Sequence, residues 1–131
     1  MIGIVIVSHS PKIATGVKDL ADQVAQGRVT IAAAGGLDDE TIGTNAERIH
    51  QALVEAACAG GTLMLVDMGS AVMSAQAAIE MLPEDERSRV SLTNAPLVEG
   101  AIIAAIEASI GKTLDEVKAA AEGAVGIDKL A

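Results

Sequence analysis

The sequence predicts an α/β fold, with a doubly wound, mainly parallel four-stranded sheet that carries helices on both faces. Short apolar runs rich in Val, Ile, Leu and Ala alternate along the chain with longer segments whose apolar residues recur at helical spacing. The first run, residues 1–7, is apolar at nearly every position, as in a strand buried on both faces. This alternation is typical of parallel sheets with right-handed crossovers.

The strands are expected where apolar runs end in turn residues. The second run is closed by the pair Gly35-Gly36, and the third begins directly after Gly60-Gly61. The fourth run is short and predicts a weaker strand. The four expected strands are residues 1–7, 29–34, 62–67 and 90–92.

The first expected helix follows the first strand without a long loop. Ser10 is a typical N-cap residue, Pro11 suits the first helical position, and Gly27 is expected to end the helix. The residues at helical spacing in this segment are Ile13, Val17, Leu20, Ala21 and Val24.

The later helices are expected from their caps and apolar spacing. Thr44 with Glu47 forms a capping-box pattern, and so does Thr113 with Glu116. Ile49, Leu53 and Ala56 would form the inner face of the second helix, and a third helix carries Val72, Met73, Gln76, Ile79 and Leu82. A fourth helix is expected to open at residues 94–96 and to run through residue 110. Residues 83–89 read as a solvated connection, and residues 125–131 as a tail or an edge strand.

Composition narrows the class of protein. We expect one domain over residues 1–131, with a core of Ile, Leu, Val, Met and Ala, because the chain contains no Phe, Tyr or Trp. The net charge of −9 and the absence of aromatic residues disfavour nucleic acid and anionic membranes as partners. The lone Cys58 is read as a buried thiol, and no segment resembles a signal peptide or a membrane span. We therefore expect a soluble, cytoplasmic protein.

Chemically versatile residues follow the expected strands. His9 comes after the first, the Gly35-Gly36 pair after the second, Asp67 after the third, and Asn94 after the fourth. Ligands of open parallel sheets bind at the carboxyl ends of the strands, so these residues are expected at one edge. If the first and third strands are neighbours, His9 and Asp67 can meet.

A histidine beside an aspartate suits nucleophilic chemistry. The carboxylate accepts the proton of one ring nitrogen and leaves the lone pair of the other free. Helix N-termini nearby would favour a phosphoryl group. The candidate backbone donors are those of Lys12, Ile13 and the start of the third helix, because Pro11 has no N–H.

Each candidate also has a purely structural interpretation. His9 could bond a loop carbonyl, and Asp67 could cap the next helix, although Ser70 is better placed for that. The Gly35-Gly36 pair could serve only the turn. His50 is expected on a helix surface. One His, one Asp and a distant Cys provide too few ligands for a metal site. The glycine-containing loop at residues 35–44 lacks the G-K-[ST] ending of a nucleotide-binding P-loop.

Four segments, read in order, resemble a known family. "GIVIVSHSPKIATG", "GGLDDETIGT", "LVDMGSAVMSAQ" and "NAPLVEGA" are together similar to the DhaM phosphotransferase subunits of bacterial PEP-dependent dihydroxyacetone kinases, whose domain is a mannose-type enzyme IIA of the sugar phosphotransferase system (PTS). The resemblance spans residues 2 to 118. It implies a homodimer with a doubly wound sheet of strand order 2-1-3-4.

The resemblance also implies a role for individual residues. His9 would accept a phosphoryl group from the phosphocarrier HPr and pass it to ADP held on the DhaL subunit, while DhaK carries dihydroxyacetone. Asp67 matches the carboxylate that orients the histidine. The positions that match the pocket lining are Ser10, Gly35, Gly36, Gly69 and Ser70. No cofactor or metal on this chain is implied, and HPr would be a separate protein.

Two other functions stay open at this point. "SHS" around His9 and "APLVEGA" before the fourth helix resemble DhaM, whereas sugar-transport IIA domains more often resemble "THG" at the first site. A mannose-type IIA that passes phosphate to a transporter IIB domain would share the His9 chemistry. A regulatory binding module of the same fold is the third possibility, against which the presence of both His9 and Asp67 weighs.

Overall fold

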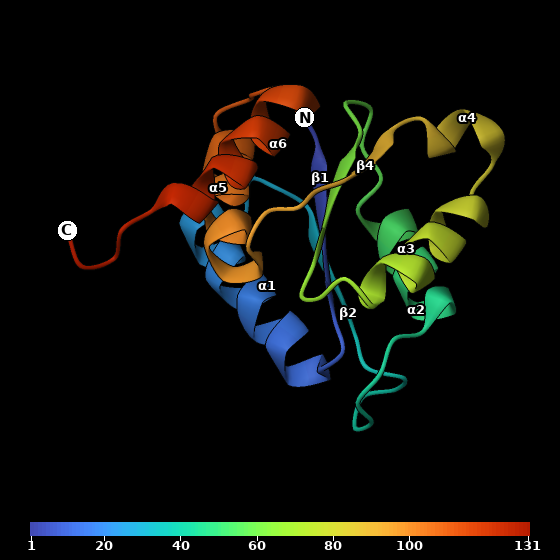
Figure 1. The fold of residues 1–131 in the computed structure, drawn as a ribbon. Helices are drawn as coiled ribbons and strands as arrows, with labels where there is room; N and C mark the ends of the chain where they lie inside the picture. The colour runs from blue at the N-terminus through green and yellow to red at the C-terminus, as the bar shows by residue number, and fades with distance from the viewer.

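Four parallel strands form the centre of the molecule (Figure 1). The computed structural model describes residues 1–131. The strands are β1 (Gly3–Ser8), β2 (Ile31–Gly35), β3 (Thr62–Val66) and β4 (Val90–Leu92), and they lie in the order β2-β1-β3-β4. The expected strand order and parallel sheet are therefore confirmed.

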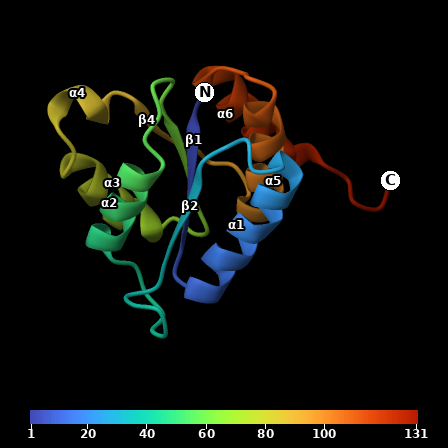
Figure 2. The same ribbon diagram turned by 180° about the vertical axis from the view of Figure 1, so that it is seen from behind.

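Helices cover both faces of this sheet. One layer contains α1 (Pro11–Ala25), α5 (Leu97–Ser109) and α6 (Leu114–Glu122), and the other contains α2 (Ala46–Glu55), α3 (Ala71–Glu80) and the short α4 (Glu84–Arg87). Figure 2 shows the two layers from behind, on either side of β1 and β2. A 3₁₀ turn, η1 (Gly123–Gly126), follows α6.

The alternation of side chains along β1 divides the core into two halves. Ile4 and Ile6 pack with α1, α5 and α6, whereas Val5 and Val7 pack with α2 and α3. All four are fully buried, because successive side chains of a strand point to opposite faces of the sheet. The run of apolar residues in the sequence thus reports a strand with a core on each side.

Alanine is the commonest buried residue of the helices. In α1 the buried residues are Ala14, Val17, Ala21 and Ala25, and in α3 they are Ala71, Ala75 and Ala78. Small side chains let a helix approach the sheet closely and fill the space without aromatic rings. The larger apolar residues that the sequence also places at helical spacing are in part exposed, including Leu20 at 53% and Met73 at 79%.

The capping predictions have different outcomes. Thr113 and Glu116 form the expected capping box at α6. The predicted box at Thr44 is wrong, because Asn45 is the N-cap of α2 and accepts from the N–H of Glu47 at 2.9 Å. The Thr44 hydroxyl instead bonds that of Ser74 on α3 at 2.7 Å, so tertiary contact overrides the local pattern.

The ends of several elements differ from the expectation. Helix α1 ends with Gln26 and Gly27 both at positive φ, which is the left-handed turn that glycine permits. Helix α5 begins at Leu97, just after Pro96. The connection at residues 83–89 includes the exposed helix α4, and the last residues form a turn and tail with no edge strand. No helix has the length and apolar character that crossing a membrane requires.

Candidate functional site

The carboxyl ends of β1 and β3 bring His9 and Asp67 together. Because β1 and β3 are paired in register from Gly3–Thr62 to Val7–Val66, the residues that follow them end at the same edge. Nδ1 of His9 lies 3.0 Å from Oδ1 of Asp67. The expected meeting of these two side chains is confirmed.

Asp67 also holds the main chain that carries the histidine. Its Oδ2 accepts from the backbone N–H of His9 at 3.0 Å and from the Ser8 hydroxyl at 3.0 Å. The loop after β2 adds a further support, since the N–H of Gly43 donates to the His9 carbonyl at 2.8 Å. Both the ring and the backbone of His9 are therefore positioned.

Ser8 is a site residue that the sequence analysis did not single out. It is fully buried, its hydroxyl donates to Asp67, and its oxygen accepts from the N–H of Ser10 at 3.0 Å. A hydroxyl at the last position of an otherwise apolar buried strand must find partners, because an unpaired buried polar group is costly. That placement is the signal that could have identified it.

The surroundings of Asp67 keep it ionised. Burial raises the pKa of the Asp67 carboxyl, but the hydrogen bonds from the His9 backbone, the His9 ring and the Ser8 hydroxyl together outweigh burial and lower it below its usual value. An ionised carboxylate only accepts hydrogen bonds, so Nδ1 of the ring must carry the proton. In the neutral ring the lone pair is then on Nε2.

Ser70 lies at that second nitrogen. Its hydroxyl oxygen is 3.0 Å from Nε2, and in this tautomer the hydroxyl donates. The histidine side chain is 21% exposed, so Nε2 faces the surface near the start of α3. Ser70 occupies the N-cap position of α3, as its sequence position suggests, but its side chain makes no capping bond, and Asp67 makes none either.

The turn before α3 offers unused backbone donors. The N–H groups of Gly69 and Ser70 donate to no other group of the chain, whereas those of Ala71 and Val72 are bonded within the turn. The N–H of Ile13, an expected donor at the other helix, is taken by the Ser10 side chain at 3.2 Å. The N–H of Lys12, the other expected donor at α1, also bonds no group of the chain, so α1 offers one free donor and the turn before α3 offers two. Free donors at a helix N-terminus suit an anionic group, so the α3 side is the better place for one.

The Gly35-Gly36 pair acts through close packing. A Cβ on Gly35 would lie 2.5 Å from the Ser10 carbonyl oxygen and 2.7 Å from the Pro11 Cα. Gly36 has a φ of +76°, and its N–H donates to the Ser8 carbonyl at 3.2 Å. The pair thus lets the end of β2 support the segment that carries His9. By contrast, a Cβ on Gly69 would meet nothing within 4 Å.

The remaining candidate residues lie away from this cluster. Ser10 is beside His9 but its hydroxyl is used as the N-cap of α1. His50 is half-buried on α2, and Cys58, expected to be buried, is half-exposed beyond the end of that helix. No three His, Cys, Asp or Glu side chains gather in a way that could hold a metal ion.

Comparison with known proteins gives a consistent result. The family model described as "PTS system fructose IIA component", EIIA-man, matches residues 3–118. A crystal structure of protein EF1359, itself of unknown function, has a TM-score of 0.82 and 34% identity, and the match covers 94% of this chain and 95% of the other.

Curated relatives carry a more specific name. The chain is 42% identical over 120 residues to the "PEP-dependent dihydroxyacetone kinase, phosphoryl donor subunit DhaM" of Providencia stuartii, covering 89% of this chain and 25% of that protein. It is 38% identical to the "PTS-dependent dihydroxyacetone kinase, phosphotransferase subunit DhaM" of Lactococcus lactis, covering 88% and 89% respectively. The chain thus spans about a quarter of the length of the first relative and most of the second.

Proposed function

Because this chain belongs to the EIIA-man family of PTS IIA components, we propose that it is a phosphoryl carrier that acts through Nε2 of His9. The phosphoryl group would come from HPr and pass to ADP bound on DhaL, for the phosphorylation of dihydroxyacetone by DhaK. The observation that carries the proposal is the alignment of Asp67, the His9 ring and Ser70, with Nδ1 bonded to a carboxylate and Nε2 facing a surface hydroxyl.

The proposed chemistry uses one nitrogen in two successive transfers. In the first, the lone pair of Nε2 forms a P–N bond as the bond between phosphorus and the donor breaks, and Asp67 stabilises the positive charge that develops on the ring. In the second, an oxygen of the ADP β-phosphate bonds to phosphorus and the electron pair of the P–N bond returns to Nε2. The N–H groups of Gly69 and Ser70 and the Ser70 hydroxyl would stabilise the phosphoryl oxygens.

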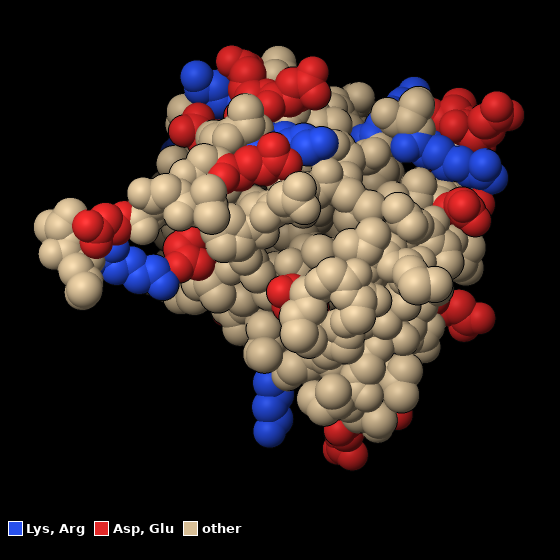
Figure 3. Space-filling view, in the orientation of Figure 1, with Lys and Arg blue, Asp and Glu red and all other residues tan.

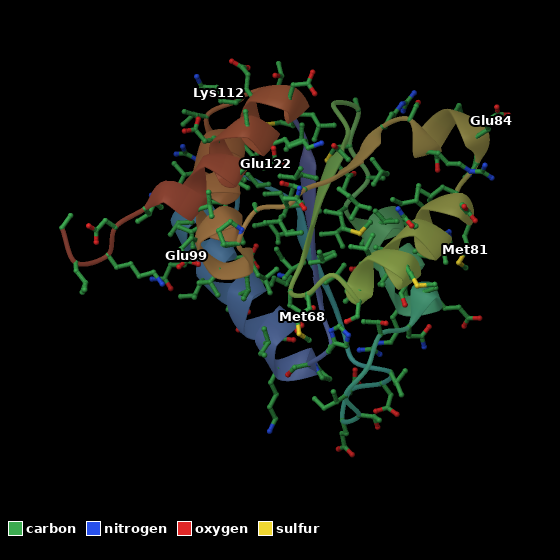
Figure 4. The ribbon with its side chains drawn as sticks, viewed as in Figure 1. Met68, Met81, Glu84, Glu99, Lys112 and Glu122 are labelled. Atoms are coloured by element: carbon green, nitrogen blue, oxygen red, sulfur yellow. The ribbon has the colours of Figure 1, made fainter.

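The surface around His9 is suited to protein partners. Four exposed apolar side chains lie on the segments that surround the histidine, namely Ile13 at 50%, Ile42 at 67%, Met68 at 54% and Met73 at 79%. Figure 4 shows Met68 at the lower end of the sheet, near the start of α1, and Figure 3 shows few charged side chains on the centre of this face. Apolar, Met-containing patches with a polar rim are typical of protein interfaces. Two different partners could then approach the same nitrogen.

The decisive experiment follows the phosphoryl group. The protein is incubated with PEP, enzyme I and HPr, and its intact mass and the acid lability of any added group are measured. DhaL–ADP with DhaK is then added to one sample and a mannose-type IIB domain to another. A single acid-labile phosphoryl group that is lost to DhaL–ADP supports the proposal, whereas loss only to IIB assigns the chain to sugar transport.

The two histidines of the chain provide a matched control. His9→Ala should fold normally and gain no phosphoryl group, while His50→Ala on α2 should be phosphorylated like the parent protein. Labelling that persists in His9→Ala would move the site to another residue. A parent protein that gains no phosphoryl group at all would leave a binding module as the better description.

We extend the proposal to a cytoplasmic homodimer. Helices α1 and α5 lie side by side, and each exposes large apolar residues near its C-terminal end: Leu20 at 53%, Val24 at 39%, Ile106 at 44% and Ile110 at 64%. A second copy would cover such a stripe. Light scattering should therefore give a dimer for the parent and for Leu130→Glu in the exposed tail, and a monomer for Leu20→Glu. A parent that is monomeric at all concentrations would contradict this part.

A further inference from the structure

A hollow lies beside the His9–Asp67 pair, outside the carboxyl ends of β3 and β4. It has a volume of about 480 Å³ and is bounded by the turn after β3, the first half of α3, residues 92–97, and the side chains of Lys118 and Glu122 on α6. Figure 3 shows this face of the molecule hollowed near its centre. The position is where open parallel sheets bind ligands, and the volume is in the range of small-molecule sites.

The walls of this hollow, named here the β3/β4 groove, carry polar groups that no other part of the chain satisfies. Gln76 and Asn94 are exposed, and their side-chain amides bond no other group of the chain, so they are available to a ligand; Lys118 takes part in none of the four ion pairs. Glu122 accepts from the Thr93 hydroxyl at 2.7 Å through Oε2. Its other oxygen, Oε1, has no partner. Donors and acceptors therefore line the same small space.

The charges of the β3/β4 groove decide which ligand fits. The groove is lined by two carboxylates, those of Asp67 and Glu122, and by one ammonium group, that of Lys118. Apart from the N–H of Gly69, which the proposed phosphoryl group would use, the groove offers an anionic ligand a net negative wall, in a protein whose net charge is already −9. A neutral molecule with several hydroxyls meets no such repulsion, because each hydroxyl can donate to a carboxylate and accept from an amide or an ammonium. Apolar wall residues such as Val72 and Leu97 suit its C–H surface.

We infer that the β3/β4 groove binds a small, neutral, polyhydroxylated molecule, a sugar or a polyol. The groove shares Asp67, Met68 and Gly69 with the surroundings of His9, but neither the His9 ring nor Ser70 lines it. A ligand there is a neighbour of the reactive nitrogen and does not occupy it. The inference concerns binding alone and does not depend on phosphoryl transfer.

Titration of the ¹⁵N-labelled full chain tests this inference directly. The neutral probes are glycerol and glucose, and their charged counterparts are glycerol 3-phosphate and glucose 6-phosphate, all at constant ionic strength. Saturable shifts of the amide signals of Met68, Gly69 and Asn94 are expected with at least one neutral probe, with a Kd on the order of 1 mM. The charged counterparts should bind about tenfold more weakly or not at all.

Four variants test whether the binding is specific to the groove and how its charge acts. Gln76→Ala and Asn94→Ala should each weaken binding severalfold, while Gln23→Ala removes an exposed amide from α1 and should change nothing. Glu122→Gln keeps an acceptor for the Thr93 hydroxyl but removes a negative charge from the groove. It should therefore reduce the difference in Kd between the neutral probes and their phosphate esters.

Four results would overturn the inference. They are shifts that never saturate, shifts spread over the whole surface, equal or tighter binding of the phosphate esters, and variants at Gln76 and Asn94 that bind like the parent. The phosphorylation of His9 is measured in a separate experiment. A protein that binds no sugar or polyol could therefore still carry a phosphoryl group, and a protein that is not phosphorylated could still bind one.

Discussion

Asp67 holds the ring and the backbone of His9 with its two carboxylate oxygens. Oδ1 lies 3.0 Å from Nδ1 of the ring, and Oδ2 accepts from the N–H of the same residue at 3.0 Å. One side chain thus sets the tautomer of the imidazole and the position of the main chain that bears it. The predictions below follow from this shared contact and from the groups around it.

Replacement of Asp67 should affect transfer far more than docking. In Asp67→Asn the amide can donate to the ring, which favours the tautomer with the lone pair on Nδ1 and the proton on Nε2. We expect the rate of phosphorylation by HPr to fall by about 100-fold or more, as for other groups that orient a reacting histidine. Binding of unphosphorylated HPr, measured by calorimetry, should change little. Equal losses in both measurements would indicate a mainly structural role for Asp67.

Ser70 should tune the reactivity of Nε2 without being essential. Ser70→Ala removes the hydroxyl 3.0 Å from Nε2 and leaves the backbone N–H in place. The phosphorylation rate, measured by quench and intact mass, should fall by about tenfold, which is the size of one hydrogen bond to a charged group. Ser70→Thr should restore most of the loss, and Ser109→Ala at the end of α5 should have no effect. A rate unchanged in Ser70→Ala would show that the hydroxyl takes no part in transfer.

Two glycines near the site should respond very differently to the same substitution. Gly35→Ala places a Cβ 2.5 Å from the Ser10 carbonyl oxygen, so the segment before α1 must shift. We expect a loss of about 1–3 kcal/mol in the free energy of unfolding. Gly69→Ala meets nothing within 4 Å and should stay within about 0.5 kcal/mol of the parent. Urea denaturation measures the free energy of unfolding of both variants. Equal losses of unfolding free energy in Gly35→Ala and Gly69→Ala would contradict the packing role of Gly35.

Asp67 should also give stability a particular dependence on pH. Its pKa is lower in the folded than in the unfolded chain, so its ionised form favours folding. This contribution is complete above the ordinary carboxyl pKa of about 4 and is lost as the pH falls through the lower, folded value. The difference in unfolding free energy between the parent and Asp67→Asn should therefore shrink as the pH falls below about 4. A difference that is constant with pH would contradict the assigned pKa direction.

The sequence alone was sufficient for the architecture, because the signals that define it are local. A strand buried on both faces must be apolar at consecutive positions, and residues 4–7 of β1 show this directly. Alternation with helices then implies a parallel sheet, and a parallel sheet brings the residues after its strands to one edge. The positions of His9 and Asp67 at that edge therefore follow from the sequence alone.

The tertiary structure decided which atoms meet, because hydrogen bonds depend on separations that the sequence does not record. Thr44 has the local pattern of a cap, yet the neighbouring helix offers Ser74, and Asn45 becomes the cap. Ser70 occupies the N-cap position of α3, but its hydroxyl bonds Nε2 of His9, 61 positions away in the sequence, and makes no capping bond. Local patterns specify what a residue can do when nothing distant competes for it. Once the sheet has formed, a distant partner can satisfy the same hydroxyl, and only the folded chain shows which partner it bonds.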